Sequence, residues 1–344
     1  MKEIIGNIYN EWNEDGNFSG VIIVSGADGV IFQQAVGYRN MAEKLPNMPD
    51  TVFSIASGTK LFTGLAVCKL IDEGKLSLDD RLHDLLRYGL GQIGNGVTVH
   101  HLLTHTSGVG DYIDEEAEDS EEQLDALYRK YPSYLWTQLE YYLQMIAPLP
   151  PKFEPGARYG YSNTGYVLLG LVIEAVSGLP YQQYVQENII GPCRLARTGF
   201  YRMDDLPGNT ALGYIEDEDS GAWRTNIFSL PILGGSDGGL YTCAADMDML
   251  WRRIFANQVL SESMTQTFLR KHVVIDEEDG ESYGLGVYRY DDDGKTAHFA
   301  VGGDSGVGFC TAYYPKTGVA MSCFSNTGWM GFYDLIADLM EVLG

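Results

Sequence analysis

Strand-like segments occupy both ends of this 344-residue chain while its middle is predicted to be helical, and this arrangement is the strongest constraint on its fold. Near the N-terminus, apolar runs at residues 20–25 and 30–37 flank an Asp-Gly turn, which predicts a hairpin. Short strands return near the C-terminus, at residues 286–290, 296–301, 307–314 and 319–324. Residues 76–207 instead have helical periodicity punctuated by proline and glycine. The sheet must therefore be assembled from both ends of the chain.

Helices are also predicted at the two termini, over residues 3–13 and 331–343. The pattern predicts an α/β fold of the α+β type, in which an antiparallel β-sheet is flanked by helices and carries an inserted all-helical domain. We place the discontinuous sheet domain at residues 1–75 and 208–344, and the helical domain at residues 76–207.

The charge of the chain limits its partners. Lys and Arg number 23 against 47 Asp and Glu, so the formal net charge is −24. Such a chain repels nucleic acid and anionic membranes, which favours a small neutral or cationic substrate. The first residues lack the apolar run of a secretion signal, and no run of eighteen apolar residues occurs. We therefore expect a cytoplasmic protein with no membrane partner.

Cysteine and histidine spacing argues against disulfides and metal. The five cysteines are odd in number and contain no C-x-x-C pair, so we expect reduced core thiols, even for Cys310 and Cys323 across a predicted hairpin. The histidines at 100, 101 and 105 lack an H-E-x-x-H pattern, which favours packing or capping. No glycine cluster precedes Lys-Ser or Lys-Thr, as a phosphate loop would require. We expect neither a metal nor a cofactor.

A serine and a lysine lie three residues apart at the start of an apolar helix that runs toward Gly74. Ser57 and Lys60 share one side of its first turn, where the positive end of the helix dipole disfavours an ammonium. A desolvated lysine there can take the serine's proton during attack on a carbonyl. The S-x-x-K pattern alone equally fits a capping serine followed by a solvated lysine.

Two further segments have more than one interpretation. Tyr161 and Asn163 lie on a loop before an apolar helix and can both point into a cleft, although a buried tyrosine is an ordinary core residue. Residues 111–125 hold nine acidic residues and no basic one, beside Tyr112. This segment is either a solvated face or an electrostatic lip that selects cationic substrates.

Four motifs in order give the chain a resemblance to the serine β-lactamase-like superfamily. They are Ser57-Gly58-Thr59-Lys60, residues 101–108 (His-Leu-Leu-Thr-His-Thr-Ser-Gly), Tyr161-Ser162-Asn163 and residues 238–242 (Gly-Gly-Leu-Tyr-Thr). That superfamily includes class C β-lactamases, penicillin-binding D-alanyl-D-alanine carboxypeptidases, D-aminopeptidases and family VIII esterases. The resemblance spans residues 20–326, and the ordered set is far more specific than any one motif.

The resemblance implies a β-lactamase/transpeptidase-like fold with its active site in the cleft between the two domains. It implies that Ser57 is the nucleophile, that Lys60 and Tyr161 share the general-base role, and that Asn163 positions Lys60 and the substrate. The backbone N–H groups of Ser57 and Gly303 would form the oxyanion hole. A charged Lys60 would lower the pKa of Tyr161, which would then return the proton to the leaving group and activate water.

The third motif of the superfamily, K-T-G or H-x-G, has three candidates here. Lys316-Thr317-Gly318 spells it but lies at a predicted hairpin tip, and Lys295-Thr296-Ala297 lacks the glycine. We align the motif at Ala300-Val301-Gly302, so the basic position is Ala300. By strand alternation, His298 lies on the same face and could partly substitute. We place Ala300, Gly302, His298 and Tyr112 at the substrate-binding surface.

The absence of a basic residue at position 300 favours some activities of this superfamily over others. In β-lactamases and carboxypeptidases it helps to hold the substrate's carboxylate, whereas esterase relatives tolerate its loss. We therefore predict a serine hydrolase that forms a covalent acyl-enzyme on a small ester or amide. The alternatives are a D-amino-acid peptidase, a class C-like β-lactamase and a non-catalytic penicillin-binding module.

The alternative of a trypsin-like protease takes Gly303-Asp304-Ser305-Gly306 as the nucleophile loop and His105 as the base. The helical middle of the chain disfavours a double β-barrel. We expect the partner to be a small-molecule ester, amide or β-lactam, and no obligate protein partner is inferred.

Overall fold

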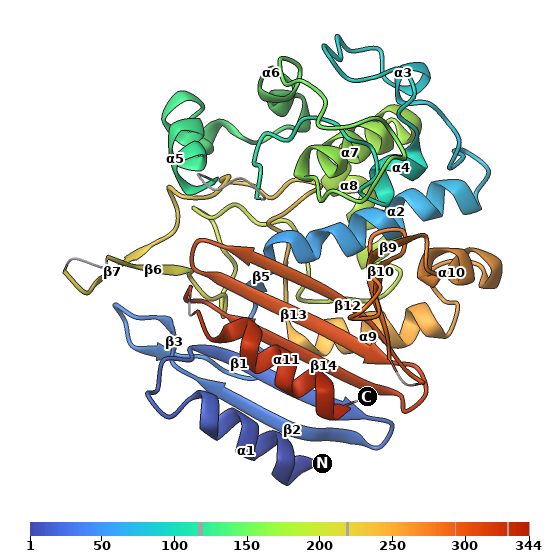
Figure 1. The fold of residues 1–344 in the computed structure, drawn as a ribbon. Coiled ribbons are helices and arrows are strands. Elements are labelled where there is room, and N and C mark those ends of the chain that lie inside the picture. The colour runs from blue at the N-terminus through green and yellow to red at the C-terminus, as the bar shows by residue number, and fades with distance from the viewer. Residues whose placement is uncertain (116–119, 218–219, 293, 329, 344) are drawn as a thin grey trace.

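An eight-stranded antiparallel sheet organises the computed structural model, which describes residues 1–115, 120–217, 220–292, 294–328 and 330–343 (Figure 1). The strand order is β2-β1-β14-β13-β12-β11-β10-β9. The strands are β1 Gly20–Gly26, β2 Gly29–Val36, β9 Val273–Asp276, β10 Glu281–Tyr283, β11 Tyr288–Asp292, β12 Lys295–Asp304, β13 Val307–Tyr314 and β14 Val319–Ser325. The N-terminal hairpin thus pairs with the last strand, which confirms the predicted fold class.

Three short strand pairs lie outside this sheet: β3 Tyr38–Asn40 with β4 Leu45–Pro46, β5 Phe53–Ser54 with β8 Tyr241–Thr242, and β6 Tyr214–Asp217 with β7 Ala222–Thr225. The pair β5–β8 adjoins the segment that holds Ser57, because Ser54 pairs with Tyr241. These short pairs were not predicted.

Helices cover the two faces of the sheet. On one face, α1 (Lys2–Trp12) and α11 (Phe332–Leu343) pack together, and Trp12 Nε1 donates a hydrogen bond to Asp338 over 2.7 Å. The other face carries α2 (Thr59–Asp72), α9 (Ala244–Phe255) and α10 (Glu262–Leu269). Both terminal helices were predicted from their periodicity, whereas α9 and α10 were not.

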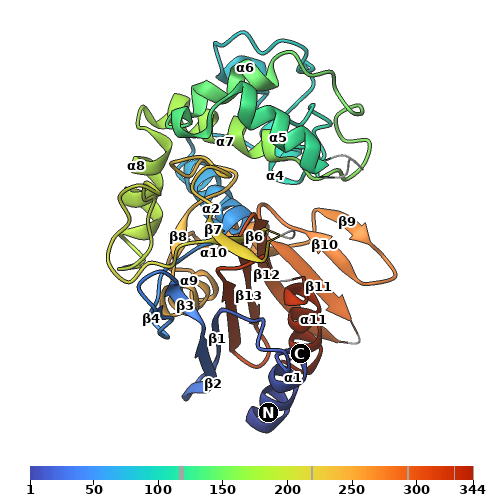
Figure 2. The ribbon, with the colours of Figure 1, turned by 90° about the vertical axis from the view of Figure 1, so that its left-hand side faces the viewer.

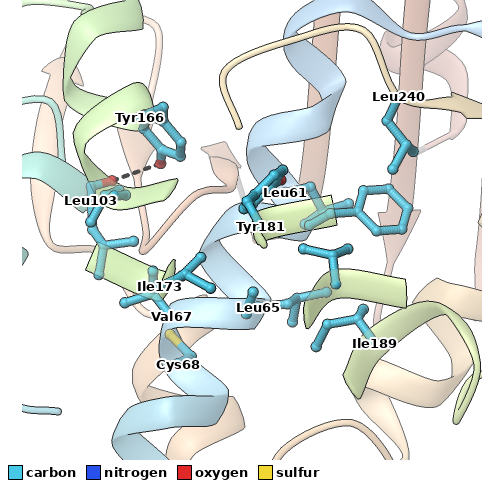
Figure 3. Close-up of a cluster of buried hydrophobic side chains, with 14 of the residues drawn as sticks. Leu61, Leu65, Val67, Cys68, Leu103, Tyr166, Ile173, Tyr181, Ile189 and Leu240 are labelled. Carbon is cyan, nitrogen blue, oxygen red and sulfur yellow. Dashed lines mark hydrogen bonds between the residues drawn. The ribbon is translucent and has the colours of Figure 1, made fainter. Parts of the chain in front are cut away.

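The helix α2 is buried on almost every side. Its side chains from Thr59 to Cys68 are buried, and it lies between the sheet and the remaining helices (Figure 2). Figure 3 shows Leu61 and Leu65 among apolar side chains from other helices, including Ile173 and Ile189. The helix ends at Asp72 because Gly74 adopts a φ of 69°, as its position predicted.

Helices fill the middle of the chain, as predicted for residues 76–207. They are α3 Leu82–Leu85, α4 Val99–Leu103, α5 Ser120–Lys130, η2 Ser133–Leu135, η3 Leu139–Tyr142, α6 Leu143–Ile146, α7 Asn163–Ser177, α8 Tyr181–Val185 and η4 Gln186–Ile190. They lie across α2 from the sheet (Figure 2). The domain boundaries at 75/76 and 207/208 remain a prediction.

Within the described ranges, no one helix combines the length and apolar content of a membrane span; α7 and the segment Tyr181–Ile190 meet those criteria only as a pair, bent by 76°. The five cysteines are buried and unpaired. Cys310 and Cys323 do face each other across β13 and β14.

Two candidates for the third motif can now be placed. Lys316-Thr317-Gly318 forms the tip of the β13–β14 hairpin, where Tyr314 pairs with Val319 and Gly318 has a φ of 68°, as predicted.

The candidate Ala300-Val301-Gly302 lies on strand β12, which passes directly behind the start of α2. A Cβ atom at Gly302 would overlap Ile55 O and lie 2.9 Å from Ser57 N. Only glycine at 302 therefore allows the strand to approach Ser57 this closely.

We expect Gly302→Ala to lower the free energy of unfolding by about 1–3 kcal/mol, because a methyl group would push β12 away from the Ser57 backbone. Gly208→Ala is the matched control, since a Cβ there meets no atom within 4 Å. Chemical denaturation of both variants measures the effect. Equal stability of the two variants would show that β12 can move away at no cost.

Candidate active site

Ser57 lies in a single 3₁₀ turn, η1 (Ala56–Gly58), directly before α2. The preceding residue, Ala56, has a φ of 44°, which is unfavourable for a residue with a side chain. Hydrogen bonds hold this conformation: Thr59 Oγ1 donates to Ala56 O over 2.7 Å and accepts from Leu240 N over 3.0 Å. The turn thereby exposes part of Ser57 while Lys60 stays inside α2.

Lys60 Nζ is buried and makes three polar contacts. It lies 2.9 Å from Ser57 Oγ, 2.7 Å from Asn163 Oδ1 and 2.7 Å from the backbone oxygen of Asp237. Only 3% of the residue is exposed, and this burial lowers the pKa of Lys60, against the raising effect of the nearby carboxylates. The amine is thus placed to take a proton from Ser57.

Tyr161 contacts Ser57 from the other side. Its hydroxyl donates to Ser57 Oγ over 2.8 Å, and its ring packs on His105 with the centroids 4.6 Å apart. Burial, followed by the charge of Glu115, raises the pKa of Tyr161 well above 10. The predicted lowering by Lys60 is wrong, because a buried phenolate loses its hydration, so that burial raises the pKa of Tyr161.

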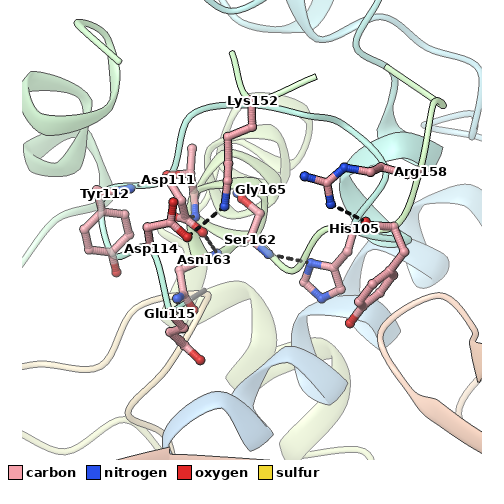
Figure 4. Close-up of polar contacts among 12 residues, drawn as sticks. His105, Asp111, Tyr112, Asp114, Glu115, Lys152, Arg158, Ser162, Asn163 and Gly165 are labelled. Carbon is pink, nitrogen blue, oxygen red and sulfur yellow. Dashed lines mark hydrogen bonds and ion pairs between the residues drawn. The ribbon is translucent and has the colours of Figure 1, made fainter. Parts of the chain in front are cut away.

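Asn163 is the first residue of α7, and its position is fixed from two directions (Figure 4). The carboxylate of Asp111 accepts the backbone N–H of Asn163 over 2.7 Å and that of Thr164 over 2.9 Å. The side-chain amide donates to Glu115 Oε1 over 2.7 Å. Because the side-chain nitrogen of Asn163 is already hydrogen-bonded, its side-chain oxygen Oδ1 is the atom that points at Lys60 Nζ. Burial raises the pKa of Asp111 to about 6.

A cavity of about 370 Å³ opens over Ser57. Tyr112 and Gly303 both line it, as predicted. Three of its described lining residues are carboxylic acids, Glu115, Asp237 and Asp304, and none is Lys, Arg or His. The Tyr112 hydroxyl donates a hydrogen bond to the Asp237 carboxylate. The cavity wall is therefore acidic as well as aromatic.

Three predicted substrate contacts do not fit the structure. His298 and Ala300 are 3% and 4% exposed, and neither they nor Gly302 line the cavity. His298 lies 3.2 Å from Leu269 O and packs against the ring of Phe255. These residues do share one face of β12, as alternation predicted, but that face meets α2, α9 and α10.

The trypsin-like arrangement does not form. His105 is fully buried, and its Nδ1 accepts the backbone N–H of Ser162 over 3.1 Å. Ser305 lies at the cavity, where its backbone oxygen accepts from Asn226 over 2.9 Å. No contact between His105 and Ser305 occurs among the residues that the structure describes.

The acidic segment 111–125 contributes to the site in its first part. Asp111 caps α7, Glu115 lines the cavity, and Asp114 pairs with Lys152 over 2.8 Å. Residues 116, 118 and 119 lie outside the described residues, and so do the side chains at 121, 122 and 125. In the described part, Asp111 and Asp114 therefore have defined partners, while Glu115 is exposed at the cavity.

Sequence reasoning missed the roles of Asp111, Asp237 and Asp304. Each lay beside a recognised feature: Asp111 begins the acidic segment, Asp237 precedes the motif at residues 238–242, and Asp304 follows Gly303. A search for carboxylates next to the motifs would have found all three.

This chain is similar to known proteins in both sequence and fold. The Beta-lactamase family model matches residues 7–336. A penicillin-binding protein from Bacillus halodurans is 41% identical, with a TM-score of 0.89, over 99% of this chain and 100% of that one. Penicillin-binding protein 4* of Bacillus subtilis is 30% identical over 62% of this chain, and the match covers 45% of that relative's length. A D-stereospecific amidohydrolase from Streptomyces shares the fold, at 23% identity and a TM-score of 0.82 over 98% of each chain.

We expect His298 to make the protein less stable in acid. Burial lowers the pKa of His298 from 6.5 to about 4, so the unfolded chain binds more protons between these values and stability falls as the pH falls. The loss from pH 6.5 to 4 is about 3 kcal/mol at 1.36 kcal/mol per pKa unit. Denaturant unfolding of His298→Gln, which cannot titrate, should show a shallower pH dependence by that amount. If the stability of the wild type and of His298→Gln depended on pH in the same way, His298 would not be the source of the acid sensitivity.

Proposed function

The chain belongs to the beta-lactamase family, and from that premise we propose that it is a serine hydrolase that forms a covalent acyl-enzyme on a small ester or amide. One observation carries the proposal: Ser57 Oγ lies within hydrogen-bond distance of both Lys60 Nζ and Tyr161 OH. A hydroxyl that lies between a buried amine and a phenol has a base and a proton donor within hydrogen-bond distance.

The hydrogen-bond contacts of Lys60 support its role as the base. Two acceptors, Asn163 Oδ1 and Asp237 O, take two N–H groups of the amine. In the neutral form that burial favours, the remaining lone pair faces Ser57 Oγ. As Ser57 attacks the carbonyl carbon, its proton passes to this lone pair.

Tyr161 acts as the proton donor in the proposed cycle. Its raised pKa keeps the phenol protonated, and it contacts the same oxygen that attacks. When the bond from carbon to the leaving group breaks, Tyr161 gives its proton to the departing atom and recovers one from Lys60. Water then attacks the acyl-enzyme carbon while Lys60 takes one of the water's protons; the bond from this carbon to Ser57 Oγ breaks, and Lys60 returns the proton to Ser57 Oγ.

The backbone N–H groups of Ser57 and Gly303 are the proposed oxyanion donors. Ser57 N belongs to the first turn before α2, where N–H groups lack helical partners. Gly302 lies against Ser57 N, which brings the next residue, Gly303, to the cavity wall above the nucleophile. Each such donor typically contributes about 10²- to 10³-fold to the rate.

Substrates that lack a carboxylate fit the cavity best. Position 300, where relatives carry a basic residue, is a buried alanine. The described cavity wall holds three carboxylates and no cationic side chain, so an anionic substrate would be repelled. We therefore favour an esterase or amidase over a D-amino-acid peptidase, a class C-like β-lactamase or a non-catalytic penicillin-binding module.

We expect wild-type protein to hydrolyse p-nitrophenyl acetate and butyrate, and Ser57→Ala to lower kcat/KM by about 10³-fold or more, because the nucleophile is lost. Ser77→Ala, on an exposed loop, is the matched control. Mass spectrometry of quenched reactions should find the acyl group on Ser57 only. Equal turnover by wild type and Ser57→Ala would rule out the proposed mechanism.

We also expect benzylpenicillin and a chromogenic cephalosporin to be hydrolysed with kcat/KM at least about 100-fold below that of p-nitrophenyl butyrate, because their carboxylates face acidic walls. Steady-state kinetics on the same preparation measures the ratio. A β-lactam rate equal to the ester rate would mean that the cavity accepts carboxylates. A stable penicillin adduct without ester turnover would support the binding module instead.

A further inference from the structure

Residues 101–108, the second of the four ordered motifs, lie alongside the loop that carries Tyr161. The backbone oxygen of His105 accepts the backbone N–H of Gly160 over 2.9 Å. Two residues further along the loop, His105 Nδ1 accepts the backbone N–H of Ser162 over 3.1 Å (Figure 4). The residues on both sides of Tyr161 are therefore hydrogen-bonded to His105.

The imidazole ring of His105 also packs on the phenol ring of Tyr161. The two centroids are 4.6 Å apart, and the rings are inclined by 31°. The rings of Tyr166 and Tyr283 contact the same imidazole, with centroids 4.9 Å and 4.8 Å away. His105, Tyr166 and Tyr283 are all buried. Because close-packed side chains have little room to move, the imidazole offers the Tyr161 ring a fixed surface.

His105 is not itself placed to act as an acid or a base. Burial, followed by the charge of Lys60, lowers the pKa of His105 well below 6.5, so the ring is neutral near neutral pH. Since Nδ1 accepts a hydrogen bond, the ring proton lies on Nε2, which has no hydrogen-bond partner among the described residues. Any effect of His105 on the reaction must therefore pass through the residues that it contacts.

We infer that His105 is a positioning residue, whose Nδ1 atom and ring hold the hydroxyl of Tyr161 on Ser57 Oγ and toward the leaving group. The inference rests on the proposed acyl-enzyme function, in which Tyr161 is the proton donor.

Tyr161 needs such support because it lies on a loop, before the first turn of α7. In the part of the chain that the structure describes, its hydroxyl makes one hydrogen bond, to Ser57 Oγ. The direction of the phenol is thus set by its backbone and by the contacts of its ring, and His105 contributes to both. A shift of about 1 Å in a catalytic group can lower a rate by about 10²-fold.

Three substitutions separate the two kinds of contact. His105→Asn keeps an acceptor and tolerates the φ of 56° at this position, but it removes the ring. His105→Phe keeps a ring and removes the acceptor, and His105→Ala removes both. Thermal unfolding identifies the variants that fold.

The kinetic test compares phenyl butyrate with p-nitrophenyl butyrate, which share the acyl group. The more basic phenolate depends more strongly on proton donation by Tyr161. We expect each variant to lower kcat/KM for phenyl butyrate at least about fivefold more than for p-nitrophenyl butyrate, with the largest effect in His105→Ala. A merely structural role would lower both esters alike. An unchanged ratio of the two esters in every variant that folds would overturn the inference.

Tyr161→Phe tests whether the effect passes through the phenol. This substitution should change the ratio in the same direction, and adding His105→Ala to it should change the ratio by less than about twofold further. A full, additive effect of His105→Ala in the Tyr161→Phe background would contradict the inference. His83→Ala is the control, because this exposed histidine also contacts a backbone oxygen, that of Ile93, and it should keep the ratio of the wild type.

Crystal structures of the wild type and of His105→Ala separate this inference from the proposed function, because they require no turnover. We expect the Tyr161 hydroxyl to move out of hydrogen-bond distance of Ser57 Oγ in the variant. His105→Asn takes its place if His105→Ala does not fold. A displaced hydroxyl without any ester turnover would support the inference and defeat only the acyl-enzyme mechanism. An unmoved hydroxyl would overturn the inference even if ester hydrolysis depends on Ser57.

Discussion

The three contacts of Lys60 Nζ connect the parts of the chain on which the site depends. Ser57 precedes α2, Asn163 begins α7 on the helical side, and Asp237 lies in the segment before β8. A buried amine needs all of its partners, because an unsatisfied or unpaired polar group in a core is costly. The same requirement that stabilises Lys60 therefore aligns α2, α7 and the β8 segment around one hydroxyl.

Negative charge surrounds this amine. Burial favours the neutral form of Lys60, while Asp237, Glu115, Asp111 and Asp304 favour the charged form. The carboxylates have partly separate partners: the N-terminus of α7 for Asp111 and the Tyr112 hydroxyl for Asp237. Because these partners stabilise the carboxylates of Asp111 and Asp237 locally, Lys60 is not required as their ion-pair partner, which is compatible with its proposed role as the base.

Sequence patterns predicted the helices and strands in which buried residues recur at a regular spacing. They did not predict elements that form only through contacts with distant parts of the chain. The termini, the β1–β2 hairpin and β12 to β14 have clear periodicity, whereas the short pairs β5–β8 and β6–β7 depend on segments far apart or on brief runs. Alternation correctly grouped His298 with Ala300 but could not say which face of β12 meets the cavity. The pKa of Tyr161 was mispredicted because burial is not visible in a motif.

Strand β12 shows how one element sets both the geometry and the charge of the cavity. Its inner face has no room for a side chain at Gly302, so the strand can approach the nucleophile, and the small Ala300 packs in the core beside it. At its end, Gly303 and Asp304 turn to the cavity. The strand carries a buried alanine at position 300, and the ionisable side chain that β12 contributes to the cavity is the carboxyl group of Asp304. Since electrostatic repulsion is strongest at short range, Asp304 supports the proposed preference for substrates without a carboxylate, together with Glu115 and Asp237.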